Sequence, residues 1–521
     1  MEILISILPI LALIVCMMGF KLSGDKSALI ALVLTVIIGL WAAPSMGFAP
    51  EAFEVSGVGW ALVEGILKAI FPILLIILMA IFSYNVLLES RQIEIIKSQF
   101  TGLSDDPRIR VLLLVWGFGG LLEGMAGFGT AVAIPAAILI SLGFKPAFSA
   151  LVSLLANSVA TGFGAVGVPV ITLANEVANG AASTELVQQI SANVVVQLSL
   201  LMFIIPYLIL FLTDRRAKAQ LSNVILALIV GVVSLAVQYV AARYLGAETP
   251  AILGSIASII VIVAYAKIQE RYFKRKENQT EQKAVVHKYT ASETMKAWSV
   301  YALILVFIIL ASPLSGPIGQ GLKQIAVSKI HLPIYPEGKF FQFAWLSNAA
   351  LMLFLGAFLG GLIQGLGVKQ LFLVFAKTVV GLRKTTVTII SLIALSSVMT
   401  YSGMILVIAK ALADATGSMY PLVAPLIGAI GTFVTGSDTS SNILFGKLQA
   451  NVAANINVDT NWLAAANTAG ATGGKIISPQ SIAIATAACK EEGTEGQILR
   501  SALPYALFYV IVAGAMVFFL A

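Results

Sequence analysis

The sequence predicts an all-α membrane protein with about 12 to 15 membrane segments, some of them broken or re-entrant, and three observations lead to this fold class. Of 521 residues, 59% are hydrophobic and 11% are charged, whereas about 25% are charged in a soluble domain. The mean hydropathy is +0.96. Apolar stretches of about 18 residues or more, the length that a helix needs to cross a bilayer, recur from one end of the chain to the other.

The first apolar segment follows Glu2 without the basic residues that open a signal peptide, so we expect a retained helix. Cys16 and Cys489 both lie in apolar sequence, which predicts packing rather than a disulfide framework. The clearest apolar segments are, in chain order, Ile3–Phe20, Leu29–Phe48, Leu62–Leu88, Val194–Leu212, Val224–Val240, Ile252–Ala266, Tyr301–Leu314, Phe341–Leu366, Thr386–Ile408 and Ala502–Leu520.

The basic residues are placed as membrane topology requires. They gather in Arg91–Arg110, around Arg215 and in Arg271–Lys296, whereas Ala49–Trp60 and Asn175–Ala192 have none. By the positive-inside rule the first three groups are cytoplasmic and the other two external, so the net charge of +7 favours orientation in a membrane over nucleic-acid binding. The segment 315–339 should be external, yet it contains Lys323, Lys329 and Lys339. A cytoplasmic linker over 269–296 divides the chain into membrane halves 1–268 and 297–521.

Two regions, 117–170 in the first half and 435–480 in the second, are too polar and too rich in glycine for ordinary membrane helices. In each, a Gly-x-x-Thr is followed by an Asn and, 12 residues after it, by a Pro: Asn157 to Pro169, and Asn467 to Pro479. This spacing suggests a two-fold internal repeat, although a register that pairs Pro146 with Pro421 is also arguable. Interrupted helices at corresponding places in two halves indicate the substrate site of a transporter.

A broken helix frees backbone amides and carbonyls, and its N-terminus offers donors and a positive dipole end to an anion. Isolated small-residue pairs, such as Gly356 with Gly360, instead predict close helix packing. Lys475 is able to bind a carboxylate, or to pair with Asp438 in the empty protein. The candidate substrate-binding residues in the two regions are Thr130, Asn157, Ser437, Thr439, Ser440, Asn442, Asn467, Lys475, Ser478 and Gln480.

Asp438 and Glu123 are the candidates for carrying a coupled proton, because a carboxylate within a membrane is costly and is seldom kept there without a function. Asp438 with its neighbouring hydroxyls also suits a hard cation, and its simplest alternative role is a helix cap. Glu64 and Lys68 stand four residues apart on one helix face and are able to neutralise each other.

The sequence predicts no cofactor and no metal site. Residues 162–167 have the spacing G-x-G-x-x-G but lie in an apolar membrane stretch without a strand–helix unit, so we reject a dinucleotide site. Residues 470–475 resemble a phosphate loop but lack its first glycine, and Ile476 stands where Ser or Thr is needed. His287 and His331 both fall outside the apolar segments.

Four stretches closely resemble the signature sequences of the bacterial lactate permease family: EGMAGFGTAVAIPAA, ANSVATGFGAVGVPV, TGSDTSSNILFGKLQ and AAANTAGATGGKIISPQSIAIATAA. The resemblance runs from about Leu62 to the C-terminus. It implies a multi-pass carrier of the bacterial plasma membrane that takes up L-lactate, often also D-lactate or glycolate, together with protons. Its partners would be this small monocarboxylate, protons and membrane lipid, with no nucleic acid and with a homo-oligomer as an open alternative.

We therefore expect a secondary active transporter and not an enzyme. A sodium-coupled carboxylate or dicarboxylate carrier is the first alternative, since the oxygen groups around Asp438 also suit sodium. An integral membrane enzyme is a remote alternative, because the sequence has no histidine cluster and no pairing of a nucleophile with a base. A channel is the third alternative function, and counterflow of labelled substrate distinguishes a channel from a carrier.

Overall fold

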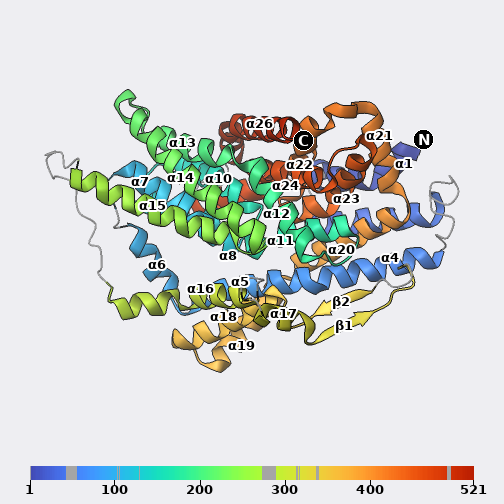
Figure 1. Cartoon of the computed structure of the whole chain (residues 1–521), viewed down its shortest axis with the longest axis horizontal. Helices are drawn as coiled ribbons and strands as arrows, with labels where there is room; N and C mark the ends of the chain where they lie inside the picture. The colour runs from blue at the N-terminus through green and yellow to red at the C-terminus, as the bar shows by residue number, and fades with distance from the viewer. Residues whose placement is uncertain are drawn as a thin grey trace.

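The computed structural model describes residues 2–20, 22–42, 55–101, 104, 106–127, 129–272, 289–311, 315, 317–335, 340–489 and 494–521. Most of the 269–296 linker, with His287, therefore lies outside the described residues, as do Lys339 and the first half of Ala49–Trp60. Almost all of the described chain is helical, as the apolar sequence predicts (Figure 1).

The first half of the chain forms helices that are mostly apolar. They are α1 (Glu2–Ile14), α2 (Gly24–Ile37), α4 (Val55–Lys68), α5 (Leu75–Glu89), α6 (Gln92–Thr101), α7 (Pro107–Leu112), α8 (Gly119–Met125), α9 (Thr130–Ser141), α10 (Pro146–Thr161), α11 (Gly164–Ala178), α12 (Thr184–Leu198), α13 (Leu201–Thr213), α14 (Ala217–Tyr244) and α15 (Pro250–Tyr272). Four π-helical turns continue these helices: η1 (Val15–Gly19), η2 (Ile38–Ala42), η3 (Ala69–Leu74) and η4 (Leu113–Phe118).

The second half adds a small β-ribbon to its helices. Its elements are α16 (Ala291–Ala311), α17 (Pro317–Gln324), β1 (Val327–Ile330), β2 (Phe341–Ala344), α18 (Ala349–Ile363), α19 (Val368–Gly381), α20 (Arg383–Tyr401), α21 (Met404–Thr416), the short 3₁₀ turn η6 (Gly417–Met419), α22 (Tyr420–Thr435), α23 (Asp438–Ile456), α24 (Thr460–Lys475), α25 (Pro479–Cys489) and α26 (Glu495–Phe519).

Seven of the described helices are long and apolar enough to cross a membrane, or nine if each of two sharply bent pairs counts as one span. The bent pairs are α10 with α11, at 48°, and α12 with α13, at 44°. The sequence-based number of about 12 to 15 also counted short and re-entrant segments, and three shorter apolar helices, α1, α9 and α18, are of that kind. The full number of membrane segments and the two-fold repeat both stay predictions.

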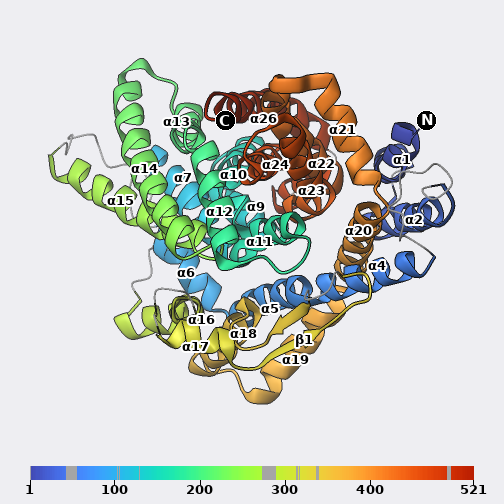
Figure 2. The same cartoon turned by 45° about the vertical axis from the view of Figure 1, so that its right-hand side comes forward.

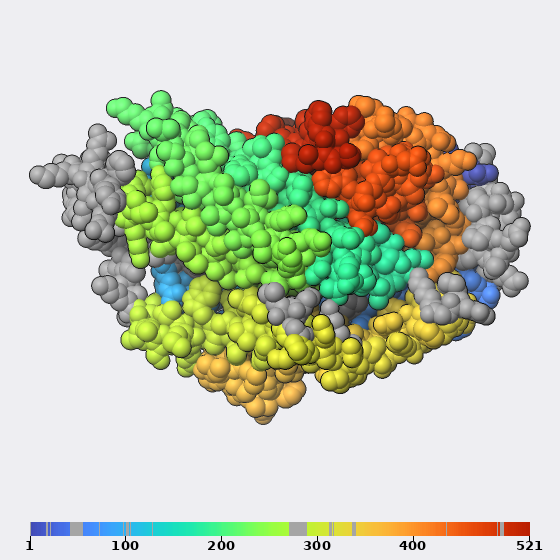
Figure 3. Space-filling view, in the orientation of Figure 1, coloured from blue at the N-terminus to red at the C-terminus, as the bar shows by residue number. Residues whose placement is uncertain are grey.

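Helices from the two halves of the chain are interleaved. We call α8–α12 together with α22–α26 the central bundle, because α11 packs on α23 and both α12 and α22 pack on α24 (Figure 2). We call α4, α5 and α16–α20 the arm, since α18 packs on both α16 and α5, and α20 packs on α4. Figure 3 shows much of the arm as a yellow and orange band beneath the green helices α13–α15. The candidate residues all belong to the central bundle.

Close contacts between helices depend on glycine, as the small-residue pairs predict. A Cβ at Gly356 would lie 2.7 Å from the backbone nitrogen of Ile304, and one at Gly360 would lie 2.6 Å from the Cα of Val300, both on α16. Van der Waals packing holds membrane helices together, so these glycines allow α18 and α16 to approach closely. Cys16 and Cys489 are both buried thiols, as packing rather than a disulfide predicts, and Cys489 Sγ donates to the Pro146 carbonyl at 3.5 Å.

The β-ribbon is a departure from the purely helical prediction. β1 and β2 pair antiparallel, with Val327 opposite Ala344 and Ile330 opposite Phe341. The aromatic ring of Phe343 lies 5.2 Å from Phe71 of η3, measured between ring centroids. The run that starts at Phe341 was predicted to begin a membrane helix, but its first residues alternate between aromatic and non-aromatic side chains, which suits a pleated strand packed on one face.

Candidate functional site

The first Gly-rich region breaks the chain between α10 and α11 with a strained backbone. Ala165, Val166 and Gly167 have φ angles of 45°, 58° and 76°, in the left-handed region. Such a conformation costs an ordinary residue about 1–2 kcal/mol, and it is unusual for a β-branched valine. Val166 is completely buried. Strain of this kind persists only where the surrounding structure imposes it, and it gathers at functional sites.

Glu123 and Asn157 lie directly beside this break. Glu123, on α8, is 3% exposed, and Asn157 of α10 interacts with its carboxylate while donating from Nδ2 to the Thr161 hydroxyl at 3.0 Å. A Cβ at Gly164, where α11 begins, would lie 2.5 Å from the Glu123 Oε1. The glycine therefore leaves the space that the Glu123 carboxylate fills at the start of α11.

The second Gly-rich region breaks the chain between α22 and α23. Gly436 ends α22 with a φ of 73°, and the Gln480 side chain fills the space that a Cβ would need. Ser437, not Asp438, caps α23, because its Oγ accepts from the Ser440 amide at 3.3 Å. The Oδ1 of Asp438 accepts from the Thr432 hydroxyl at 3.2 Å, and its Oδ2 has no hydrogen-bond partner among the described residues. A capping role for Asp438 is therefore wrong.

The break between α24 and α25 brings a cation to the same place. Lys475 is the last residue of α24, is half-buried, and donates from Nζ to the Gly436 carbonyl at 3.1 Å. Its ammonium interacts electrostatically with the carboxylates of Asp438 and Glu123, which also interact with each other. We call these three residues the central charge cluster. It joins α8 of the first half to α23 and α24 of the second.

An amide network holds the two halves together next to this cluster. The Asn442 side chain donates to the Pro169 carbonyl of α11 at 3.0 Å and accepts from Asn467 at 2.9 Å and from Thr468 at 3.1 Å. Gln449 donates to Asn467 at 3.3 Å. These side chains are completely buried. Asn442 and Asn467, which the sequence offered as substrate ligands, therefore have hydrogen-bond partners within the protein.

The other predicted residues lie around the same junction in different states of exposure. Thr130 is half-buried and donates to the Gly127 carbonyl at 2.8 Å. Thr439 and Ser440 are buried in the first turn of α23, whereas Gln480 is exposed. Ser478 caps α25 by accepting from the Ser481 amide at 3.2 Å. Since α9 packs on α25 and α10 packs on α24, the structure brings the two broken regions together; that they bind substrate stays a prediction.

A second cluster of charges was missed by the sequence analysis except for its Glu64–Lys68 pair. Lys68 Nζ lies 3.0 Å from Glu64 Oε1, and Glu176, near the end of α11, interacts electrostatically with both. Glu64 is completely buried, and Glu176 is 7% exposed. The only signal for Glu176 was an acid in a nearly uncharged stretch, which we had assigned to an external loop.

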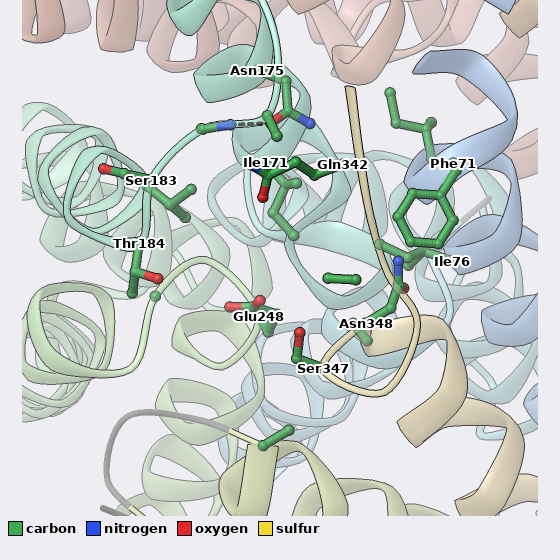
Figure 4. Close-up of a pocket in the computed structure, with 18 of the residues that line it drawn as sticks. Phe71, Ile76, Ile171, Asn175, Ser183, Thr184, Glu248, Gln342, Ser347 and Asn348 are labelled. Carbon is green, nitrogen blue, oxygen red and sulfur yellow. Dashed lines mark hydrogen bonds between the residues drawn. The ribbon is translucent and has the colours of Figure 1, made fainter. Parts of the chain in front are cut away.

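A cavity of about 400 Å³ lies against this second cluster. Figure 4 shows Asn175 and Ile171 of α11 at its upper edge, with Phe71 to the right and Glu248 below. Lys68 and Glu176 also line the cavity. The cavity thus separates the central bundle from the arm at the far end of α11 from the central charge cluster.

Comparison with known proteins agrees with the resemblance in the signature stretches. The family model described as L-lactate permease matches residues 2–521. An L-lactate permease of Streptococcus iniae is 38% identical over 462 residues, covering 89% of this chain and 93% of that protein. The glycolate permease GlcA of Escherichia coli K12 is 32% identical over 549 aligned positions, covering 98% of this chain and 94% of that protein.

A similar fold occurs among solved transporter structures. The YdaH transporter of Alcanivorax borkumensis superposes with a TM-score of 0.54 at 13% identity, covering 94% of this chain and 97% of that one. At this identity the likeness concerns the fold alone. The family model and the two relatives decide the family: the chain belongs to the L-lactate permease family.

Proposed function

We propose that this protein takes up L-lactate, and also D-lactate and glycolate, by symport with protons across the plasma membrane of a bacterium. The names of its relatives, L-lactate permease and glycolate permease, support this substrate class. The observation that carries the proposal is the central charge cluster, in which a half-buried lysine stands with two buried acids where broken helices meet.

In this proposal Lys475 holds the carboxylate of the substrate. Its ammonium now donates to a backbone carbonyl, a bond that a carboxylate replaces with a stronger, charge-assisted one. The N-terminus of α23 begins at Asp438 and adds backbone donors and a positive dipole end. The hydroxyls of Thr439 and Ser440 and the side chains of Thr130, Asn157, Ser478 and Gln480 complete the proposed site.

The charges of the cluster explain why a proton accompanies the substrate. Two carboxylates and one ammonium already leave an excess negative charge, and an anionic substrate adds another in a region where water is scarce. Uncompensated charge is costly to bury, so a proton on Asp438 or Glu123 favours substrate binding, and substrate binding favours the proton. Glu123 Oε2 and Asp438 Oδ2 both have no hydrogen-bond partner in the described part of the chain. We propose Asp438 as the main carrier because it stands among hydroxyl groups, including that of Thr432, which are able to rearrange around either protonation state.

Proton coupling also has an energetic reason. A small carboxylic acid with a pKa near about 4 is anionic at neutral pH. An inside-negative potential opposes its uptake by about 2.3 kcal/mol per 100 mV. One proton carried with each anion makes the step electrically neutral, so the proton gradient alone drives accumulation.

The experiment is uptake of labelled L-lactate into proteoliposomes that contain the purified protein, with an acidic exterior and with or without sodium. We expect accumulation that depends on the pH gradient, is unaffected by sodium and is competed by D-lactate and glycolate. Counterflow of labelled lactate without a gradient identifies a carrier rather than a channel. Accumulation that follows a sodium gradient at equal pH would contradict proton symport.

A further inference from the structure

The cavity beside the second charge cluster is poorly suited to attract an anion. Its described lining contains one basic side chain, Lys68, and two acidic ones, Glu176 and Glu248. Lys68 is already paired with Glu64 at 3.0 Å. A cavity lined in this way favours a proton over a carboxylate as its occupant, because like charges disfavour an anion and favour a proton on an acid.

Glu176 is the buried acid that this cavity reaches. Its Oε2 accepts from the Ser396 hydroxyl at 2.9 Å, and the side chain is 7% exposed. Glu64, in contrast, is completely buried and accepts from the Ser397 hydroxyl at 2.9 Å and from the Tyr401 hydroxyl at 3.1 Å. Of the two acids beside Lys68, Glu176 alone lines the cavity.

The groups around Glu176 form a series of opposite charges. Lys68 and Glu64 face it from α4 and Lys447 faces it from α23, all within electrostatic reach. The Tyr401 hydroxyl of α20 also interacts with it. Glu176 therefore links the central bundle, which contains α11 and α23, to α4 and α20 of the arm. A change in its charge alters the electrostatic interactions within both parts.

α11 connects Glu176 to the central charge cluster. The helix begins at Gly164, against the Glu123 carboxylate, and Glu176 follows 12 residues later, which is about 18 Å along a helix. Thr172 lies one turn before Glu176 on the same helix face. Its hydroxyl is completely buried and has no hydrogen-bond partner among the described residues.

We propose that Glu176 is a second proton-binding residue of the transporter, which takes up the proton from the cavity before it reaches Asp438 and Glu123. The inference rests on the proposed proton symport. Loops 180–184 and 245–248 line the cavity, and they face the exterior in the orientation that the basic residues predict. Uptake therefore begins on the side from which the proton gradient drives transport.

The test compares Glu176→Gln with Glu248→Gln, a matched change of the other acid in the cavity, in proteoliposomes. We expect Glu176→Gln to exchange lactate for lactate at a rate within about twofold of the unaltered protein. Accumulation under a pH gradient should fall by about tenfold or more, and its dependence on external pH should flatten. Glu248→Gln should keep both exchange and accumulation, because it leaves the Glu176 carboxylate in place.

Ser396→Ala provides a second variant, since it removes the hydrogen bond to Glu176 and keeps the carboxylate. It should shift the external pH at which uptake is half-maximal while exchange continues. Unchanged accumulation and pH profile in Glu176→Gln, or loss of its exchange together with accumulation, would overturn the inference and leave lactate–proton symport intact. If the unaltered protein shows no pH-driven accumulation, the proposed function fails, and this inference fails with it.

Discussion

Lys475 combines two properties that a carboxylate-binding residue needs. It is half-buried, so that its charge is partly removed from water, and its ammonium donates to the backbone carbonyl of Gly436 and forms no close ion pair with a described residue. A substrate carboxylate therefore has to displace one neutral hydrogen-bond acceptor. Lys68 is the contrasting case, because its Nζ already forms an ion pair with Glu64 Oε1 at 3.0 Å.

Replacement of Lys475 should weaken lactate binding more than it weakens the fold. The loss of a hydrogen bond between charged groups costs about 1.5–3 kcal/mol, or about tenfold to a hundredfold in affinity, for Lys475→Ala. Lys475→Arg should weaken binding less, since it keeps the charge but has a wider planar head. Lys410→Ala, at an exposed position on α21, is the control. Lactate affinity measured by calorimetry checks the prediction, and an unchanged value for Lys475→Ala would remove the lysine from the site.

Replacement of the two acids should separate exchange from accumulation. Asp438→Asn is nearly isosteric and permanently uncharged, so it imitates the protonated carrier; Glu123→Gln does the same at the second position. Both should exchange lactate for lactate, and Asp438→Asn should fail to accumulate lactate under a pH gradient. Asp414→Asn, exposed on α21, should behave like the unaltered protein. Full accumulation by both acid variants would place the coupled proton on another group.

The residue types in the sequence predicted the location of the candidate site better than they predicted the role of each residue in it. Glycines, hydroxyls and amides in apolar sequence marked both broken regions. The partners did not follow from the sequence: Asn442 is held by Pro169, Asn467 and Thr468, and Ser437 caps the helix that Asp438 begins. Such bonds join residues separated by as many as 273 positions, and no local pattern encodes them.

The helix breaks were predictable because glycine and proline act locally on the backbone. Gly436 adopts a left-handed φ at the end of α22, and α25 begins at Pro479, a favourable first position for a helix. The left-handed conformation of Ala165 and Val166 was not predictable, because neither residue favours it. Tertiary packing against Gly127 and Ala247 imposes it, since Gly127 lies against Ala165 and Gly167 lies against Ala247.

The strained turn at the start of α11 should be detectable by stability measurements. Ala165→Gly removes a left-handed alanine that costs about 1–2 kcal/mol, which offsets the lost methyl contact and the extra freedom of the unfolded chain. Its melting temperature in detergent should be unchanged or higher. Ala174→Gly, a buried position in the regular part of the same helix, should destabilise by about 1 kcal/mol. An equal loss in the two variants would show that the turn is unstrained.

The packing of helices from one half of the chain against helices of the other half could not be predicted from the sequence. Hydrophobicity identifies membrane segments because each must satisfy its own backbone, but lipid-facing and bundle-facing helices are equally apolar. That α18 packs on α5 while α23 packs on α11 depends on small-residue contacts between distant segments. The cavity between the central bundle and the arm follows from this arrangement, which is why Glu176 was not recognised as lining it.

The cavity should open to the exterior, and labelling of single cysteines tests this. Cys16→Ala and Cys489→Ala first remove the native thiols, which are buried. Ala181→Cys, exposed at the rim of the cavity, should then react with a membrane-impermeant maleimide in intact cells. Lys218→Cys, exposed at the start of α14, should react only after the membrane is permeabilised, since one bent span, α12 with α13, separates the two positions. Labelling in the opposite order would reverse the orientation and would place the Glu176 cavity on the cytoplasmic side.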